Sequence, residues 1–171
     1  RNTLLKSARA AGMKATQLGT LEIWDERLVA LGSEIIQART SLVAELAPQV
    51  SLAYSAIAGA GHGVPLALRL SIFAGPESAG SDDSADDDSA IRQGTVSTAD
   101  AAEAFTDALV RLRRAELDRG LTLIGPHRDD LVLGLNSLAA RGHASRGERW
   151  SFALALKLAS AAVLRREASA G

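Results

Sequence analysis

Apolar side chains recur at helical spacing along much of this chain. Between residues 20 and 42 they alternate at intervals of three and four, which is the pattern of one helix face. The stripe comprises Leu21, Trp24, Leu28, Leu31, Ile35, Ala38 and Leu42. We expect a long helix that Thr20 caps, with this stripe packed against another helix of the same chain. Pro48 should end or restart it, and a second helical stretch should reach Ala58.

Three further helices are predicted from their ends. Residues 2–11 form the first, which Gly12 closes. Ser97 or Thr98 caps another, which Gly120 ends. Its apolar face comprises Ala102, Phe105, Leu109 and Leu112. The last helix covers residues 145–167 and is apolar nearly all round, so we expect it to be deeply buried.

Strand patterns occupy little of the chain. Residues 64–73 alternate in the manner of a strand. Residues 121–124 and 131–135 are expected to pair as a hairpin across the turn at 125–130. The predicted fold class is therefore α+β, predominantly helical, with a small antiparallel sheet. We expect a helical part with an edge strand at 1–74, an acidic Gly/Ser/Asp linker at 75–96 and a helix, hairpin and final helix at 97–171, within one domain.

Composition narrows the class of protein. The 171 residues are 47% hydrophobic and include no cysteine, which excludes a disulfide framework and a thiolate zinc site. No apolar run is long enough to span a bilayer, and no apolar signal region opens the chain. These features favour a soluble protein of a reducing compartment, in practice the cytoplasm, with no membrane partner.

Charge is unevenly distributed although the net charge is only -1. Six acids and no base lie between residues 77 and 88, whereas bases dominate residues 141–171. A basic C-terminal segment is compatible with phosphate or nucleic-acid contact, and equally with an ordinary solvated helix face.

A tight turn at residues 125–130 carries the first candidate chemistry. His127, Asp129 and Asp130 are residue types that bind metals or transfer protons, so a metal-dependent hydrolase is one hypothesis. The alternative is a structural turn in which glycine and proline set the backbone and Arg128 pairs with a neighbouring aspartate.

A second candidate site opens the last helix. Ser145 and Glu148 have the spacing of a capping box, in which each side chain accepts from the other residue's amide. The same helix start, with Gly147 permitting close approach and arginines alongside, would also suit a phosphate. Local sequence leaves both interpretations open.

Four motifs in order resemble the RecF family, bacterial recombination-repair ATPases related to SMC and ABC-type ATPases. They are Arg-Asn-Thr-Leu-Leu-Lys at 1–6, Trp-Asp with a following leucine at 24–28, Gly-Pro-His-Arg-Asp-Asp-Leu at 125–131, and the ABC-type signature with its helix at 144–159. The resemblance implies a helical second lobe plus the signature helix. It also implies an internal fragment, because that family's Walker A motif lies upstream and its Walker B strand downstream, and neither is present.

The resemblance further implies roles for particular residues. Ser145, Gly147 and Glu148 would serve the γ-phosphate of ATP on the opposing subunit, in trans; no residue is assigned a catalytic role. Arg146 and Trp150 depart from the family's usual residues, which leaves the side-chain contacts at 146 and 149 unassigned. Candidate DNA-binding residues are Arg111, Arg113, Arg114 and Arg119.

For the full-length protein, the resemblance implies ATP and Mg²⁺, an ATP-dependent homodimer, and duplex DNA at single-strand gap junctions. It also implies RecR, RecO and RecA as partners in repair, recombination, replication and the SOS response. This fragment alone is not expected to bind these cofactors tightly or to hydrolyse ATP. The alternative function is a helical protein-interaction module with no nucleotide role, in which the stripe at 21–42 docks a partner helix.

Overall fold

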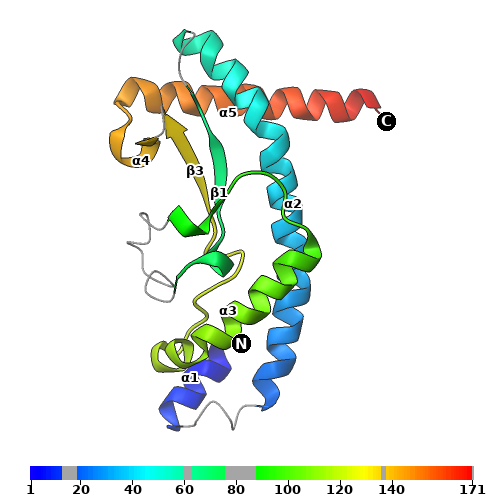
Figure 1. The fold of residues 1–171 in the computed structure, drawn as a ribbon, viewed down its shortest axis with the longest axis vertical. Coiled ribbons are helices and arrows are strands. Elements are labelled where there is room, and N and C mark those ends of the chain that lie inside the picture. The colour runs from blue at the N-terminus through cyan, green and yellow to red at the C-terminus, as the bar shows by residue number, and fades with distance from the viewer. Residues whose placement is uncertain (13–18, 60–62, 76–87, 136–137, 171) are drawn as a thin grey trace. The chain divides into compact units, whose positions relative to one another are not determined.

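The computed structural model describes residues 1–12, 19–59, 63–75, 88–135 and 138–170. The long helices are α1 (Asn2–Ala10), α2 (Gly19–Ala58), α3 (Thr98–Arg119) and α5 (Arg146–Ala170), with a short α4 (Ala140–His143) (Figure 1). The strands β1 (Leu66–Arg69), β2 (Ile91–Arg92), β3 (Asp130–Leu135) and β4 (Leu138–Ala139) form one sheet in the order β2-β1-β3-β4. The α+β, predominantly helical class is confirmed.

The chain forms two compact units, each drawn from three separate stretches. The first unit comprises Arg1–Ala38, Arg69–Ile91 and Val96–Asp130. The second comprises Arg39–Leu68, Arg92–Thr95 and Leu131–Gly171. The predicted acidic linker falls largely on residues 76–87, which lie outside the described residues, so the division at 75–96 stays a prediction.

Local sequence signals set the helix ends as expected. Gly12 follows α1 with a φ of 62°, a value that glycine adopts without strain. The Ser97 hydroxyl accepts a hydrogen bond from the Asp100 amide at the start of α3. Gly120 ends α3 in the left-handed conformation, and its amide donates to the Glu116 carbonyl.

Two expectations for α2 are wrong. Thr20 lies inside the helix, which already includes Gly19, and Pro48 neither ends nor restarts it. Proline removes one helical hydrogen bond, here to the carbonyl of Ala44. Pro48 itself is exposed. The buried positions Val43 and Val50 on either side keep the helix continuous.

The predicted apolar stripe is not the buried face of α2. Leu21 is buried, but Trp24, Leu31, Ile35 and Leu42 are all exposed. The face that is buried includes three polar side chains, Asp25, Ser33 and Thr40, beside Ile36. Because hydropathy cannot recognise polar groups that find partners inside the fold, the apolar pattern selected the wrong face.

The expected hairpin is also wrong. Residues 121–124 form no strand, and β3 pairs instead with β4, antiparallel, with Gly134 opposite Ala139. The strand expected at 64–73 is shorter, because a 3₁₀ turn at Ser71–Phe73 follows β1. The backbone amide of Thr122 donates to the Asn2 side chain and not to a neighbouring strand. This amide therefore has a hydrogen-bond partner without a strand beside it.

The last helix is only half buried, contrary to the expectation of deep burial. Phe152, Ala155, Ala159 and Val163 form its buried face, at the i, i+3, i+7, i+11 spacing of one helix side. The other face exposes four large apolar side chains, Trp150, Leu154, Leu158 and Leu164.

Candidate functional site

The start of α5 is a complete capping box. The Ser145 hydroxyl accepts from the Glu148 amide at 3.3 Å, and a Glu148 carboxylate oxygen accepts from the Ser145 amide at 2.6 Å. The Arg149 side chain adds a 3.1 Å hydrogen bond to the Ala144 carbonyl. The capping interpretation is therefore correct. It leaves the Ser145 hydroxyl hydrogen available to a further acceptor, since the oxygen uses a lone pair for the cap.

Among the residues that the structure describes, none packs closely enough against Gly147 to require a glycine there. A methyl group added there would meet nothing within 4 Å, and the φ angle does not demand glycine. Gly147 is the second residue of α5, in the first turn, where the helix amides have no intrahelical acceptors. Ser145, Arg146 and Gly147 are all exposed. The helix start is thus open to a group that needs close backbone approach, such as a phosphate.

An aromatic pair lies behind this helix start. The rings of Tyr54 and Phe152 are 4.7 Å apart between centroids. Burial raises the pKa of Tyr54, and the negative charge of Glu148 raises it further. The capping carboxylate is therefore electrostatically coupled to the second half of α2.

The turn at residues 125–130 is anchored by the first of its two aspartates, Asp129. The Ser71 amide and hydroxyl each donate to the same Asp129 oxygen at 2.9 Å. The Gly125 amide donates to the Ser71 hydroxyl, and Gly125 adopts a φ of 125°. These contacts support the structural interpretation of Asp129, while His127 and Asp130 are exposed. Within the described parts of the chain, no group of three histidine, aspartate or glutamate side chains is placed to hold a metal.

A buried ionic cluster in the first unit was not predicted. The guanidinium of Arg1 hydrogen-bonds both carboxylate oxygens of Glu116 and one oxygen of Asp25 at 2.6 Å. Burial alone would lower the pKa of Arg1, but hydrogen bonds and charge from Glu116 and Asp25 outweigh it and raise that pKa. Arg113 binds the other oxygen of Asp25 at 2.5 Å. Arg1 therefore binds both Asp25, which belongs to the second motif, and Glu116, to which no motif pointed.

Known proteins similar to this chain match it along its whole length. No family model matches the sequence. The DNA replication and repair protein RecF of Clavibacter michiganensis subsp. michiganensis is 58% identical over 100% of this chain and 42% of that protein. RecF of Leifsonia xyli subsp. xyli is 50% identical over 100% of this chain and 43% of its own length. This chain is homologous to a segment of RecF. It spans less than half the length of these relatives.

Solved RecF structures share the fold. The recombination mediator protein RecF-ATPrS in the RecFOR pathway superimposes with a TM-score of 0.76 at 24% identity, over 97% of this chain and 38% of that one. A RecF-ATP structure gives 0.75 over 99% of this chain and 39% of that one. The RecF resemblance drawn from the four motifs is confirmed.

The four arginines of α3 proposed for DNA do not share one role in this RecF-like chain. Arg113 is bound to Asp25, and Arg111 donates to the Ala74 carbonyl at 3.1 Å. Arg119 lies in the last turn of α3, where its carbonyl accepts from Arg9. Arg114 is exposed. Arg111 and Arg114 are three residues apart and so lie on one helix face, whereas Arg113 is directed toward α2.

No helix among the described residues of this RecF-like chain is both long and apolar enough to cross a bilayer.

Proposed function

We propose that this chain is the part of a RecF-like ATPase that completes the ATP site of a second subunit. The Ser145 hydroxyl and the backbone around Gly147 would bind the γ-phosphate, while Glu148 fixes the cap that orients them. The carrying observation is Gly147, the second residue of α5, which has open space around it among the described residues. Among the described residues none fills the space beside Gly147, and a phosphate could approach the helix backbone closely there.

The chemistry of this helix start suits an anion. The first-turn amides of a helix have no intrahelical acceptors, and the helix dipole adds a partial positive charge. The Ser145 hydroxyl oxygen accepts from the Glu148 amide, so its hydrogen can be donated to a phosphate oxygen. Bound ATP with Mg²⁺ supplies the phosphate charge that this end stabilises, and the chain's own residues bind and orient that phosphate.

The catalytic parts of the ATPase are expected elsewhere in the full-length protein. The sequence contains no Gly-x-x-x-x-Gly-Lys-[Ser/Thr] pattern, the loop that cradles nucleotide phosphates. The 171-residue chain alone therefore should not hydrolyse ATP. The relatives are described as DNA replication and repair proteins, and their chains are more than twice as long.

The wider role follows the family. The full-length protein would act in the cytoplasm on duplex DNA near single-strand gaps, with RecR, RecO and RecA, in recombination and the SOS response. Arg111 and Arg114 supply adjacent positive charge for DNA phosphates on α3, and Arg119 lies further along; Arg113 would first have to leave Asp25. Such binding would weaken steeply with salt.

The test is a charge placed at the helix start. In the full-length protein, Ser145→Arg should abolish ATP-driven dimerisation, measured by analytical ultracentrifugation, and leave binding of a fluorescent ATP analogue to the monomer unchanged. Ser160→Arg is the matched control, because Ser160 is exposed on the same helix, four turns further along. Dimerisation that survives Ser145→Arg would refute the role in trans.

A further inference from the structure

An apolar row on α2 lies open within the first unit, with no described residue packed over it. This α2 seam is the part of the predicted stripe that falls in that unit and comprises Trp24, Leu28, Leu31, Ile35 and Ala38. Trp24 is 53% exposed, Leu31 45% and Ile35 43%. Contiguous exposed apolar surface of this kind marks a site of association.

The spacing of the α2 seam is that of a coiled coil. Successive members are four, three, four and three residues apart, so they alternate between the d and a positions of a heptad repeat. A helix that packs only within its own fold needs one buried face, and α2 already has one, which includes Asp25, Ser33 and Ile36. The α2 seam is therefore a second packing face of the same helix.

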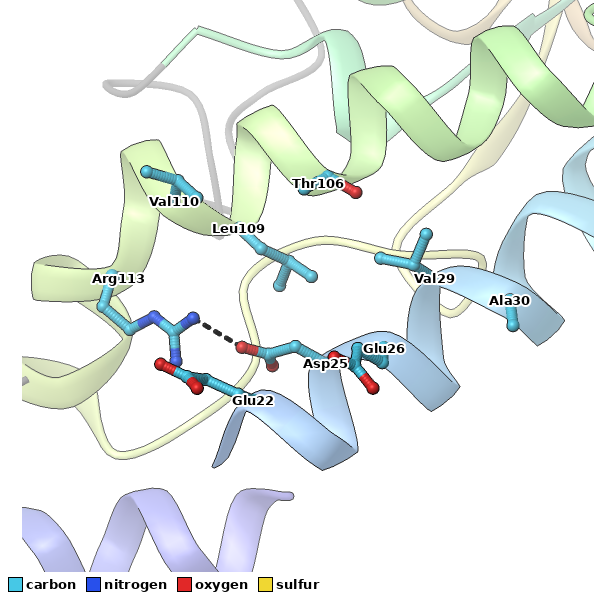
Figure 2. Close-up of a pocket in the computed structure, with 9 residues that line it drawn as sticks. All are labelled: Glu22, Asp25, Glu26, Val29, Ala30, Thr106, Leu109, Val110 and Arg113. Atoms are coloured by element: carbon cyan, nitrogen blue, oxygen red, sulfur yellow. Dashed lines mark ion pairs between the residues drawn. The ribbon is translucent and has the colours of Figure 1, made fainter. Parts of the chain in front are cut away.

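A different face of α2 packs against α3. Asp25 forms an ion pair with Arg113 across this contact (Figure 2). Glu26 and Val29 line the cleft between the two helices. At 3.6 residues per turn, residues two positions apart lie on nearly opposite sides of a helix, so Glu26 lies away from Trp24. The α2 seam is thus not part of the cleft beside α3.

One edge of the α2 seam carries charges of both signs. Arg27 and Glu34 are exposed, and each comes directly before a seam residue, at the g position of the heptad. Arg27 lines the same shallow hollow as Trp24, which places its side chain beside the seam. Neither charge has an ion-pair partner among the described residues. On the other edge, Asp25 and Gly32 are buried.

This edge is complementary to itself when two copies of α2 run in opposite directions. Leu28 then lies opposite Leu31 of the second copy, since an a position meets a d position. The same register brings Arg27 next to the second copy's Glu34, and the two-fold axis repeats that pair at the other end. Parallel helices would place Arg27 opposite the buried Gly32, which offers it no charge.

We infer that the α2 seam pairs with the α2 seam of a second copy of this protein, antiparallel and about a two-fold axis. Leu28 and Leu31 form the centre of the contact, and Arg27 and Glu34 set its direction and register. The pairing needs no nucleotide and does not involve α5, so it is separate from the proposed ATP site. The seam is short, so the pair is weak and forms as the concentration rises.

The test is the association state of the full-length protein without nucleotide. Sedimentation velocity at up to about 100 μM, a range that covers micromolar dissociation constants, should show a concentration-dependent dimer. Leu31→Asp should weaken that dimer by at least about tenfold, because it buries a charge against Leu28 of the second copy. Val110→Asp is the matched control and should change nothing, because Val110 is 68% exposed on α3 and lines the cleft with Glu26.

Charge variants test the antiparallel register. Arg27→Glu and Glu34→Arg should each weaken self-association by about tenfold, because like charges then face each other. An equimolar mixture of these two variants should associate as strongly as the wild type, since the acids of one chain meet the arginines of the other. The exchange of both charges within one chain should also restore the dimer. Circular dichroism checks that each variant keeps its helices.

Three results would overturn the inference. They are a wild-type protein that stays monomeric at every concentration, single charge variants that associate as well as the wild type, and a mixture that does not associate. A monomer would leave the seam to another protein or to the rest of the longer chain. Ser145→Arg separates this dimer from the proposed ATP role, because it should leave the nucleotide-free dimer unchanged. Loss of that dimer in Ser145→Arg would assign the contact to α5 instead.

Discussion

Glu116 is the residue on which the first unit's polar core depends. Its side chain has no exposed surface, and it accepts hydrogen bonds from Arg1 and from the Leu123 amide at 2.9 Å. Glu116→Ala leaves Arg1 buried without its principal counter-charge. We expect a loss of about 3–5 kcal/mol in the free energy of unfolding, measured with urea.

The control for this change is on the same helix. Glu103 is exposed on α3, so Glu103→Ala should alter the free energy of unfolding by less than about 0.5 kcal/mol. Equal losses at both positions would mean that helix propensity, and not the ionic cluster, sets the cost.

Two glycines should respond oppositely to alanine. A methyl group on Gly32 would lie 2.5 Å from a ring carbon of Phe105, which is fully buried. Gly32→Ala should therefore destabilise the chain by about 1–3 kcal/mol despite its better helix propensity. Gly147→Ala meets open space and should stabilise it by about 0.5 kcal/mol. Thermal unfolding of both variants measures the difference, and a stabilised Gly32→Ala would contradict the close approach of α2 and α3.

At the scale of an element, α5 has two apolar faces with different energetics. Phe152 is 3% exposed and packs on Tyr54, so Phe152→Ala should cost about 3–5 kcal/mol. Leu154 is 48% exposed on the opposite face, and Leu154→Ala should change the stability by less than about 0.5 kcal/mol. Urea unfolding monitored by circular dichroism separates them. Similar costs at the two positions would show that the second face is also packed in solution.

The contact between α2 and α5 should make the stability depend on pH. The pKa of Tyr54 lies above its ordinary value of about 10, so the folded state holds the phenol proton more tightly than the unfolded chain does. The resulting stability is fully present below about pH 10 and is lost as the pH rises through the folded pKa. Tyr54 is the single tyrosine, so its ultraviolet absorbance reports the titration directly.

The matched variant is Glu148→Gln, which removes the charge that adds to the shift. It should bring the pKa of Tyr54 closer to the ordinary value, although burial keeps it raised. An unchanged titration would show that Glu148 contributes nothing to the environment of the phenol.

At the scale of the whole molecule, the helices and the ends of α1 and α3 were predictable because their signals are local, whereas the cap at Thr20 and the break at Pro48 expected for α2 were wrong. Ser97, Gly12 and Gly120 act within a few residues of themselves, and each does what its position indicated. The pairing of β3 and the face of α2 depend on partners far along the chain. Thr122 satisfies its amide with Asn2, 120 residues away, and no periodicity in the sequence carries that information.

The candidate site divides in the same way. The spacing of Ser145 and Glu148 predicted the capping box, which the structure confirms. The burial of Asp25 was not predicted. Hydropathy places a charged residue on the surface, but ion pairs with Arg1 and Arg113 allow Asp25 to be buried. The motifs identified the family but not the role of each motif residue, because polar motif residues such as Asp25 and Asp129 form hydrogen bonds inside the fold.

Chain termini usually tolerate trimming, but the buried side chain of Arg1 reverses that rule here. An expressed fragment that began one residue later would lack the guanidinium that Glu116, Asp25 and Thr122 share. A two-residue trim would also remove Asn2 from the Thr122 amide. Fragments for solution work should therefore keep Arg1 and Asn2, because a fragment that starts at Thr3 lacks both sets of contacts and should be less stable.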